Sequence, residues 1–501
     1  MSGGDRATSS NAEIGSADLS IPTGRQTQQR TRRERAKPFS VRSKTRFAEA
    51  FRHIECKDVR ISLTNKFLPE SVSEVRSRKN DRNDDFSVTK VLPVLNAPSR
   101  SESEAPTVDQ TIGEHASLLS SQIQAMSDAL FPPTSKKSLR RFTSGEAARL
   151  IGISDSTLRK MSLAGEGPTP VTVSNGRRLY TLGQINEVRR RLAETMRGKD
   201  ATAFVPRRSS NEHLQVIAVA NFKGGSGKTT TAAHLAQYLG LHGYRTLAVD
   251  LDPQASMSAL FGVLPEADVA KNETLYAAIR YDADRRPLSE VILPTYFEGV
   301  DLVPGNLELM EFEHTTPLAL TAEDRTEGRL FFSRVARAFD EVADRYDVIV
   351  MDCPPQLGFL TLTGLCAATG MLITVHPQML DVASMSQFLL MTEALLTELR
   401  KSGAVLKYDF MRYLLTRFEP QDGPQTKVAA LLRNLFGDHV LTNPMLKSTA
   451  ISDAGLSKQT LYEIGRESMT RSTYDRAIEA LDAVNGEVEG LIRTAWGRPK
   501  C

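Results

Sequence analysis

Eight residues that follow a short apolar run constrain this chain more than any other feature. The apolar run is VIAVA at 216–220, and the octapeptide KGGSGKTT occupies 223–230. A Gly-Lys-Thr core between a buried strand and a helix is typical of a phosphate-binding loop, because backbone N–H groups and the helix N-terminus then point at an anion. The usual motif has a glycine just before Lys223, where this chain has Phe222. The sequence therefore predicts a nucleotide site whose loop begins with an extra lysine.

The residue types in this loop predict how each would act on a nucleotide. Its glycines allow tight curvature and a close approach of the backbone to phosphate. We expect Lys228 on the β- and γ-phosphates of ATP, and the Thr229 hydroxyl on Mg²⁺. The expected nucleotide contacts are Gly224, Gly225, Ser226, Gly227, Lys228, Thr229 and Thr230.

Two acidic segments downstream complete the expected site. VDLDPQAS places Asp250 and Asp252 at the end of the apolar run 246–250, and YDVIVMDCPP places Asp352 at the end of the next such run. Open α/β sheets bind ligands at the carboxyl ends of their strands. A carboxylate there is often only a helix cap, but three such elements in this order favour a nucleotide site. We then expect Asp352 to hold Mg²⁺ through water.

Apolar runs that alternate with helical segments predict the fold around this site. Beside the two runs already named, DVIVM at 347–351 and MLITV at 371–375 are mostly apolar. Strands that are buried on both faces and separated by helices form parallel sheets. The predicted fold class is therefore α/β, a P-loop doubly wound mostly parallel sheet.

The segment SGEAARLIGISDSTLRKMSL, residues 144–163, has the spacing of a helix-turn-helix. Ala148 is small enough for close helix packing, Gly152 falls in the turn, and Leu158 falls in the core of the second helix. Ser154 is placed to cap that second helix. The outward residues, of types that contact bases and phosphates, are Ser156, Thr157, Arg159 and Lys160.

A hairpin follows the two helices. VTVSNGRRLYT alternates around Asn175 and Gly176, a pair that favours a two-residue turn, and would present Arg177 and Arg178 as a wing. The whole arrangement resembles the winged helix-turn-helix of MerR-like regulators. A plain helical hairpin without a DNA function is the alternative.

Charge is distributed unevenly along the chain, although the formal net charge is only +3. Residues 136–200 hold 14 Lys or Arg against 6 Asp or Glu, and residues 1–107 hold 20 against 14. A concentrated basic module suggests nucleic acid as a partner, and a charged surface that only contacts solvent is the alternative.

The four cysteines lack metal-ligand or redox spacing, which favours a reducing, cytoplasmic setting. No uninterrupted apolar stretch approaches the ~20 residues that span a membrane.

The first hundred residues show little periodicity. The basic cluster at Arg30–Lys37 could touch phosphates, or it could be a solubilising tail or lie upstream of the true start. SLLSSQIQAMSDALF has helical spacing and ends at Pro132, and such a helix needs a neighbour or a partner subunit to cover its apolar face. The expected divisions are a disordered basic tail (1–107), an amphipathic helix and linker (108–135), a winged helix-turn-helix (136–200), a linker (201–212) and a P-loop ATPase domain (213–501).

The motifs K-G-G-x-G-K-T, D-x-D-P-Q and D-x-P-P occur here in the order found in the ParA/MinD superfamily of deviant-Walker ATPases, which the chain resembles. Over about four-fifths of its length it is most similar to the RepA partition proteins of repABC replicons. The resemblance implies a catalytic set of Lys223, Lys228 and Asp252. Asp252 would position the attacking water, and Lys223 would reach the phosphates of a partner subunit. Lys447 matches a position that contacts DNA non-specifically.

The resemblance implies a function for the whole chain. ATP would dimerise the protein and license non-specific DNA binding, and the helix-turn-helix would bind the promoter of its own operon as a repressor. A ParB/RepB-type centromere-binding protein would stimulate weak hydrolysis, so that the replicon is segregated on the nucleoid.

Three alternative functions remain open. A MinD-like membrane-cycling ATPase would need VEGLIRTAWGR as a membrane helix, and a core-packing helix is favoured instead because Glu487 and Glu489 flank it. A transcription regulator with a vestigial ATPase is disfavoured by the intact Lys228, Asp252 and Asp352. A metabolic P-loop ligase is disfavoured by the helix-turn-helix.

Overall fold

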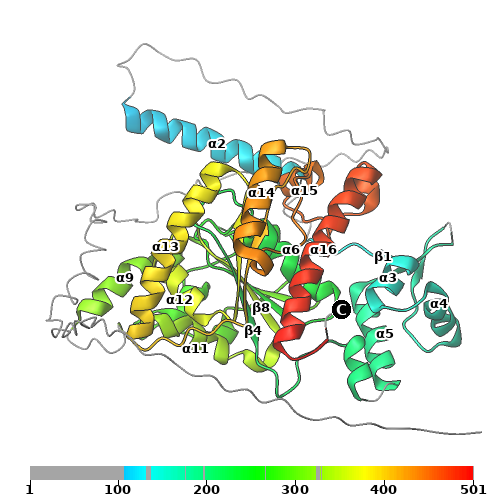
Figure 1. Cartoon of the computed structure of the whole chain (residues 1–501). Coiled ribbons are helices and arrows are strands. Elements are labelled where there is room, and N and C mark those ends of the chain that lie inside the picture. The colour runs from blue at the N-terminus through cyan, green and yellow to red at the C-terminus, as the bar shows by residue number, and fades with distance from the viewer. Residues whose placement is uncertain are drawn as a thin grey trace, which may run out of the picture. The chain divides into compact units, whose positions relative to one another are not determined.

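The computed structural model describes residues 107–499, except 131–136, 175, 196–197, 266, 323–327 and 329. The predicted basic tail, apart from Thr107, lies outside the described residues, as do Cys56 and Cys501. The described chain forms a seven-stranded sheet with helices on both sides and a smaller three-stranded sheet with its own helices (Figure 1).

The seven-stranded sheet confirms the predicted doubly wound arrangement. Its order is β10-β9-β4-β8-β5-β7-β6, and all neighbouring strands are parallel except β6 and β7. The four predicted apolar runs are the inner strands β4, β5, β8 and β9, which are buried along their whole length because helices cover both faces. The strands are β4 (Gln215–Ala220), β5 (Thr246–Asp250), β6 (Leu293–Pro294), β7 (Val300–Val303), β8 (Val348–Asp352), β9 (Gly370–Val375) and β10 (Phe410–Leu415).

Helices cover both faces of this sheet. Figure 1 shows α6 and α16 on one side, with α11 and α12 on the other. The helices of this part are α6 (Lys228–Leu241), α7 (Ser256–Leu260), α8 (Leu275–Ile279), α9 (Met310–Thr321), α11 (Arg334–Asp340), α12 (Phe359–Ala367), α13 (Met379–Lys401), α14 (Gly423–Phe436), α15 (Thr449–Leu456) and α16 (Arg471–Ala495). Short 3-10 turns are η2 (Leu288–Glu290), η3 (Leu307–Leu309), η4 (Phe331–Ser333), η5 (Ala343–Arg345), η6 (Gly437–His439) and η7 (Arg466–Ser468).

The C-terminal helix α16 is a core helix, as predicted. Val488, Ile492 and Trp496 are each less than a tenth exposed and belong to the hydrophobic core that also includes α6. The apolar face of VEGLIRTAWGR is therefore covered within the chain. By length and composition alone, α13 is the described helix that would suffice to cross a membrane, and Phe388 and Leu399 on it are buried.

The predicted helix-turn-helix is present. It consists of β1 (Phe142–Thr143), α3 (Ser144–Ile151), α4 (Asp155–Ala164), β2 (Val171–Thr172), β3 (Arg178–Tyr180) and α5 (Leu182–Thr195). Thr143 and Glu146 cap α3 reciprocally, and the left-handed Gly152 (φ 84°) ends it. Ser154 accepts a hydrogen bond from the Thr157 N–H, which confirms the predicted cap of α4.

One hydrophobic core joins this module to the ATPase sheet. Ile151, Leu158 and Ile185 belong to the same buried cluster as Leu239 of α6 and Trp496 beyond α16. Segment 201–212, predicted as a linker, is also held firmly. It begins within the 3-10 turn η1 (Gly198–Ala203), and its Glu212 pairs with Arg498 at 2.6 Å. The module and the ATPase sheet therefore share one hydrophobic core.

The amphipathic helix α2 (Val108–Leu130) begins nine residues before the segment that predicted it. Its apolar side chains Val108, Ile112, Leu118 and Leu119 are more than half exposed. The prediction that a neighbour or a partner subunit covers this face stays a prediction.

Candidate nucleotide site and DNA-reading module

The phosphate loop joins the end of β4 to the start of α6. Gly225 and Gly227 have left-handed φ angles of 73° and 88°, a conformation that glycine adopts without strain. Gly227 is also the N-cap of α6 and provides no capping side chain, so the first N–H groups of the helix are available to an anion. The local sequence thus folds into an anion-binding loop.

Lys228 is the cation at the centre of this loop. It is 6% exposed, and its Nζ donates to the carbonyl oxygen of Lys223 at 3.3 Å. Burial lowers the pKa of Lys228, while the nearby carboxylates of Asp352 and Asp252 act in the opposite direction. A desolvated ammonium with one weak partner is suited to a phosphate group.

Asp250 and Asp352 lie side by side at the carboxyl ends of β5 and β8, where they are register partners. Both are fully buried, but their hydrogen bonding differs. Asp250 accepts from the N–H and the hydroxyl of Ser258, each at 2.8 Å. Within the described residues, neither carboxylate oxygen of Asp352 has a hydrogen-bond partner of normal geometry. Asp250 therefore holds the start of α7 against the end of β5, and the Asp352 carboxylate is left for a ligand.

Burial, followed by the charge of Asp250, raises the pKa of Asp352 well above its usual range, although the nearby Thr229 hydroxyl partly offsets this. An orphaned buried carboxylate is the kind of group that a cation neutralises. Mg²⁺ needs only one or two protein oxygen ligands when phosphates and water supply the rest. The side chains of Asp352 and Thr229 therefore fit Mg²⁺, and their role as its ligands stays a prediction.

Asp252 lies at the rim of the same strand edge. It is half-buried, and its Oδ1 accepts from the N–H of Gln254 at 3.0 Å. Gly305 packs so closely on this segment that an added Cβ would lie 2.9 Å from the Asp252 carbonyl oxygen. The Asp252 carboxylate is therefore held on an ordered turn with access to solvent.

Lys223 pairs with a carboxylate of its own chain in this structure. Its ammonium pairs with Asp381, in the first turn of α13, and Asp381 also bonds the Nδ1 of His376 at 3.1 Å. The preceding Phe222 stacks on Phe388 of α13, with ring centroids 5.9 Å apart. The residue that replaces the usual glycine therefore packs against α13, and this explains why a large apolar side chain is accommodated there.

The second helix of the helix-turn-helix, α4, presents its predicted residues to solvent. Ser156, Thr157, Arg159 and Lys160 are all exposed, whereas Leu158 is 1% exposed and faces the core. Arg159 also pairs with Asp155 at 2.9 Å on the surface. The face predicted to contact DNA is thus available.

Two of the residues predicted to contact DNA, Arg178 and Lys447, are less free than expected. Arg177 is exposed, but Arg178 lies in β3 opposite Thr172 and is half-buried, because alternate residues of a strand face opposite sides. Lys447 is exposed and pairs with Glu419 at 2.9 Å. Sequence reasoning missed this pairing and that of Lys223, since neither is local in the sequence.

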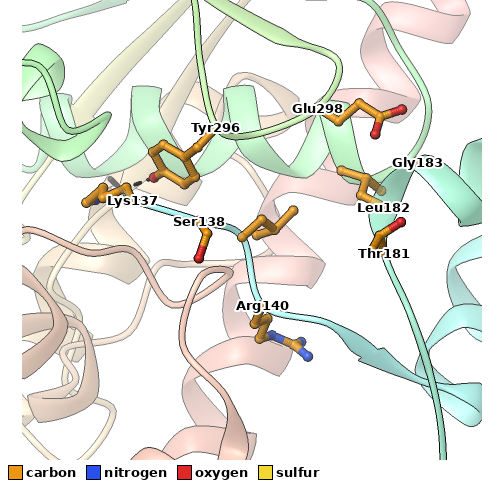
Figure 2. A pocket seen from close by; sticks show the side chains of 9 residues that line it. Lys137, Ser138, Arg140, Thr181, Leu182, Gly183, Tyr296 and Glu298 are labelled. Atoms are coloured by element: carbon orange, nitrogen blue, oxygen red, sulfur yellow. Dashed lines mark hydrogen bonds between the residues drawn. The ribbon is translucent and has the colours of Figure 1, made fainter. Parts of the chain in front are cut away.

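The start of the DNA-reading module is anchored to the ATPase domain. The Lys137 ammonium donates to the carbonyl oxygen of Leu260 (2.7 Å) and to Glu463 (2.9 Å), and it lies beside Tyr296 (Figure 2). Lys137 and Tyr296 border a cavity of ≈ 250 Å³ that Arg140 and Glu298 also line. Leu260 is the last residue of α7, the short helix that follows Asp252, so this anchor ties the module to the segment after β5.

Comparison with known proteins agrees with this geometry. A family profile described as an AAA domain matches residues 214–404, and one described as a MerR family regulatory protein matches 143–180. A replication protein A of Sinorhizobium fredii is 53% identical over 403 residues, which cover 80% of this chain and 98% of that protein. SopA of Escherichia coli K12 is 31% identical and covers 73% and 92%. The chain belongs to the ParA/MinD superfamily of ATPases.

The superfamily fold extends over most of the described chain. A solved structure described as a partition protein shares the fold with a TM-score of 0.52, at 20% identity, over 76% of this chain and 98% of the other. The fold of the described chain is therefore shared with that solved structure over most of its length.

Proposed function

We propose that this chain is a plasmid-partition ATPase that binds ATP with Mg²⁺, dimerises on it and binds DNA in that state. One observation carries the proposal: the buried, unpartnered carboxylate of Asp352 lies at the strand end that faces Lys228 and Thr229. Burying this carboxyl costs stability, and a bound cation offsets that cost, so its presence supports a site that still binds Mg²⁺.

In this proposal the phosphate loop binds the triphosphate, Asp352 holds Mg²⁺, and Asp252 acts on the attacking water. Lys228 and the N–H groups of Gly224–Thr230 bind phosphate oxygens, and Mg²⁺ supplies charge neutralisation between them. Asp252 orients the attacking water from the rim of the site. Lys223, once it leaves Asp381, stabilises phosphate charge on the partner subunit. The position of Lys228 at the helix N-terminus and the solvent access of Asp252 support these assignments.

The winged module gives the proposal its DNA partner. Thr157 and Arg159 of α4 would read base edges, and Arg177 would contact the backbone beside them. An operator in the chain's own operon is the specific site, with autorepression as the result. Lys447 would add a non-specific contact, so that the ATP-bound dimer is retained on the nucleoid in the cytoplasm.

The remaining partner is a centromere-binding protein of the ParB/RepB type that stimulates a weak ATPase. The names of the relatives support this, because they include replication protein A, SopA and the chromosome partitioning protein ParA of Myxococcus xanthus. The burial of the C-terminal helix favours this reading over membrane cycling, since the apolar face that a membrane anchor needs is in the core.

The proposal is tested by measuring how much of the protein stays bound to random DNA with ATP, with ADP or without nucleotide. The salt concentration is held fixed, because affinity for DNA depends strongly on it. Lys228→Ala should abolish the ATP-dependent retention, and Asp252→Ala should keep ATP binding and dimerisation but stop turnover. Arg159→Ala is the matched control, because it should weaken operator binding while the ATPase rate stays unchanged. Unchanged retention by Lys228→Ala would refute the ATP switch.

A further inference from the structure

The two residues that follow β10 contact the phosphate loop at two consecutive peptide groups. The Thr416 hydroxyl donates to the carbonyl oxygen of Ser226 at 2.7 Å. The Arg417 Nη1 donates to the carbonyl oxygen of Gly225 at 3.3 Å. Neither residue belongs to a nucleotide-binding motif of the sequence. Both reach the loop because β10 ends at the same edge of the sheet as β4.

The backbone of Arg417 is unusual at this contact. Its φ is 52°, in the left-handed region, where a side chain costs free energy that glycine would not. Its neighbours are fixed on both sides, because Thr416 N–H bonds the Val375 carbonyl and Phe418 N–H bonds the Met445 carbonyl. Thr416 and Phe418 are both buried, whereas Arg417 is exposed. The left-handed conformation of Arg417 therefore lets Thr416 and Phe418, on either side of it, both pack inward. The Arg417 guanidinium meanwhile lies over the phosphate loop.

The two accepting carbonyls are chemically coupled to the anion site. The carbonyl of Gly225 shares its peptide group with the N–H of Ser226, and the carbonyl of Ser226 shares its own with the N–H of Gly227. A donor on the outer carbonyl fixes the plane of the peptide and polarises its N–H, which then donates more strongly to an anion on the other side. A charged donor does this more than a neutral one.

We propose that Thr416 and Arg417 form a brace on the phosphate loop, and that Arg417 is a positioning residue that sets the affinity for nucleotide phosphates. The proposal rests on the proposed function as a nucleotide-binding protein. Arg417 acts through the Gly225 carbonyl and not on the γ-phosphate. Loss of the guanidinium should therefore weaken ATP and ADP by the same factor, because loop N–H groups serve the phosphates that both nucleotides share.

The test compares Arg417→Gly with wild type in the full-length chain. Glycine relieves the left-handed strain and removes the guanidinium. The stability of the fold should therefore stay or rise, while the affinity for nucleotide falls. Isothermal titration calorimetry should show the dissociation constants of Mg-ATP and Mg-ADP rising about threefold to tenfold. The melting temperature without nucleotide should stay or rise, and the turnover rate at saturating ATP should change less than about twofold.

Lys458→Gly is the matched control. Lys458 also has a left-handed φ, of 50°, and loses the same charge, but its carbonyl contacts Lys137 rather than the loop. It should leave both dissociation constants unchanged. Arg417→Lys should restore most of the affinity, since an ammonium can donate to the same carbonyl.

The outcomes separate this inference from the proposed function. Wild-type affinity in Arg417→Gly, an equal loss in Lys458→Gly, a loss for ATP alone, or a parallel fall in melting temperature would each overturn the brace. Failure of the wild type to bind ATP would overturn the proposed function itself. Wild-type binding that Lys228→Ala abolishes and Arg417→Gly leaves intact would overturn the brace only.

Discussion

The Lys223 ammonium forms an ion pair with Asp381 of the same chain. A lysine proposed to reach the phosphates of a partner subunit is thus held by its own α13 in this structure. The pair is partly exposed, with 42% of the Lys223 side chain accessible and Asp381 nearly buried. Dimerisation through Lys223 requires this pair to open, so Asp381 opposes the dimer by the free energy of one such pair.

Replacing Asp381 with Asn should therefore favour the ATP-bound dimer. Partly exposed ion pairs contribute at most about 1 kcal/mol, so we expect up to about a fivefold gain in the dimerisation constant. Sedimentation velocity with a non-hydrolysable ATP analogue measures it. Lys401→Ala, which breaks a surface pair with Glu398 on the same helix, is the control. A weaker dimer in Asp381→Asn would contradict the assignment.

Replacing Asp352 with Asn should separate stability from metal binding. Burial raises the pKa of Asp352, so burying this carboxyl costs stability that a neutral amide at the same position avoids. Calorimetry without nucleotide should show an equal or higher melting temperature, while the added stabilisation by Mg-ATP disappears and turnover falls by about a hundredfold or more. Retained Mg²⁺-dependent turnover would show that Asp352 does not hold the metal.

His234 should make the fold sensitive to acid. Its Nδ1 bonds the Thr230 carbonyl and its Nε2 faces the Leu461 N–H, so the ring is neutral, and burial lowers its pKa from 6.5 to about 4. The unfolded chain then gains a proton below pH 6.5 that the folded chain takes up only near pH 4. Stability is lost across that window, by about 2 kcal/mol at pH 5.

Urea unfolding at pH 7 and pH 5 measures this loss, with His234→Gln as the reference. The variant lacks the titrating ring, so the difference between wild type and variant should shrink as the pH falls. A difference that is independent of pH between 7 and 5 would mean that His234 titrates normally in the folded protein.

Lys137→Met should loosen the winged module. Removing the ammonium leaves Glu463 as a buried charge without its partner, and breaking such a pair is strongly destabilising. We expect a fall in melting temperature of roughly 5 °C. Adding Glu463→Gln should recover part of it, because the uncompensated charge is gone. No recovery in the double variant would mean that packing of the lysine stem, rather than charge pairing, holds the module.

The nucleotide site was predictable because its parts are local in the sequence. Gly225, Gly227 and Lys228 lie in one loop, and the apolar runs before Asp250 and Asp352 identify strand ends. The helix-turn-helix could also be predicted from the sequence, since the motif fixes the spacing of Ala148, Gly152, Ser154 and Leu158. A short motif fixes its own backbone, and apolar periodicity fixes which face is buried.

Tertiary structure alone decided how these parts meet. Strand order makes Asp250 and Asp352 neighbours, and hydrogen bonds from Ser258 leave only Asp352 for a cation. It also pairs Lys223 with Asp381 and brings Arg417 onto the loop, from segments far apart in the chain. The sequence determined a nucleotide loop and a DNA-reading helix. Which charges are paired and which are left for a ligand depended on the fold, because pairing between distant residues follows from packing and not from spacing.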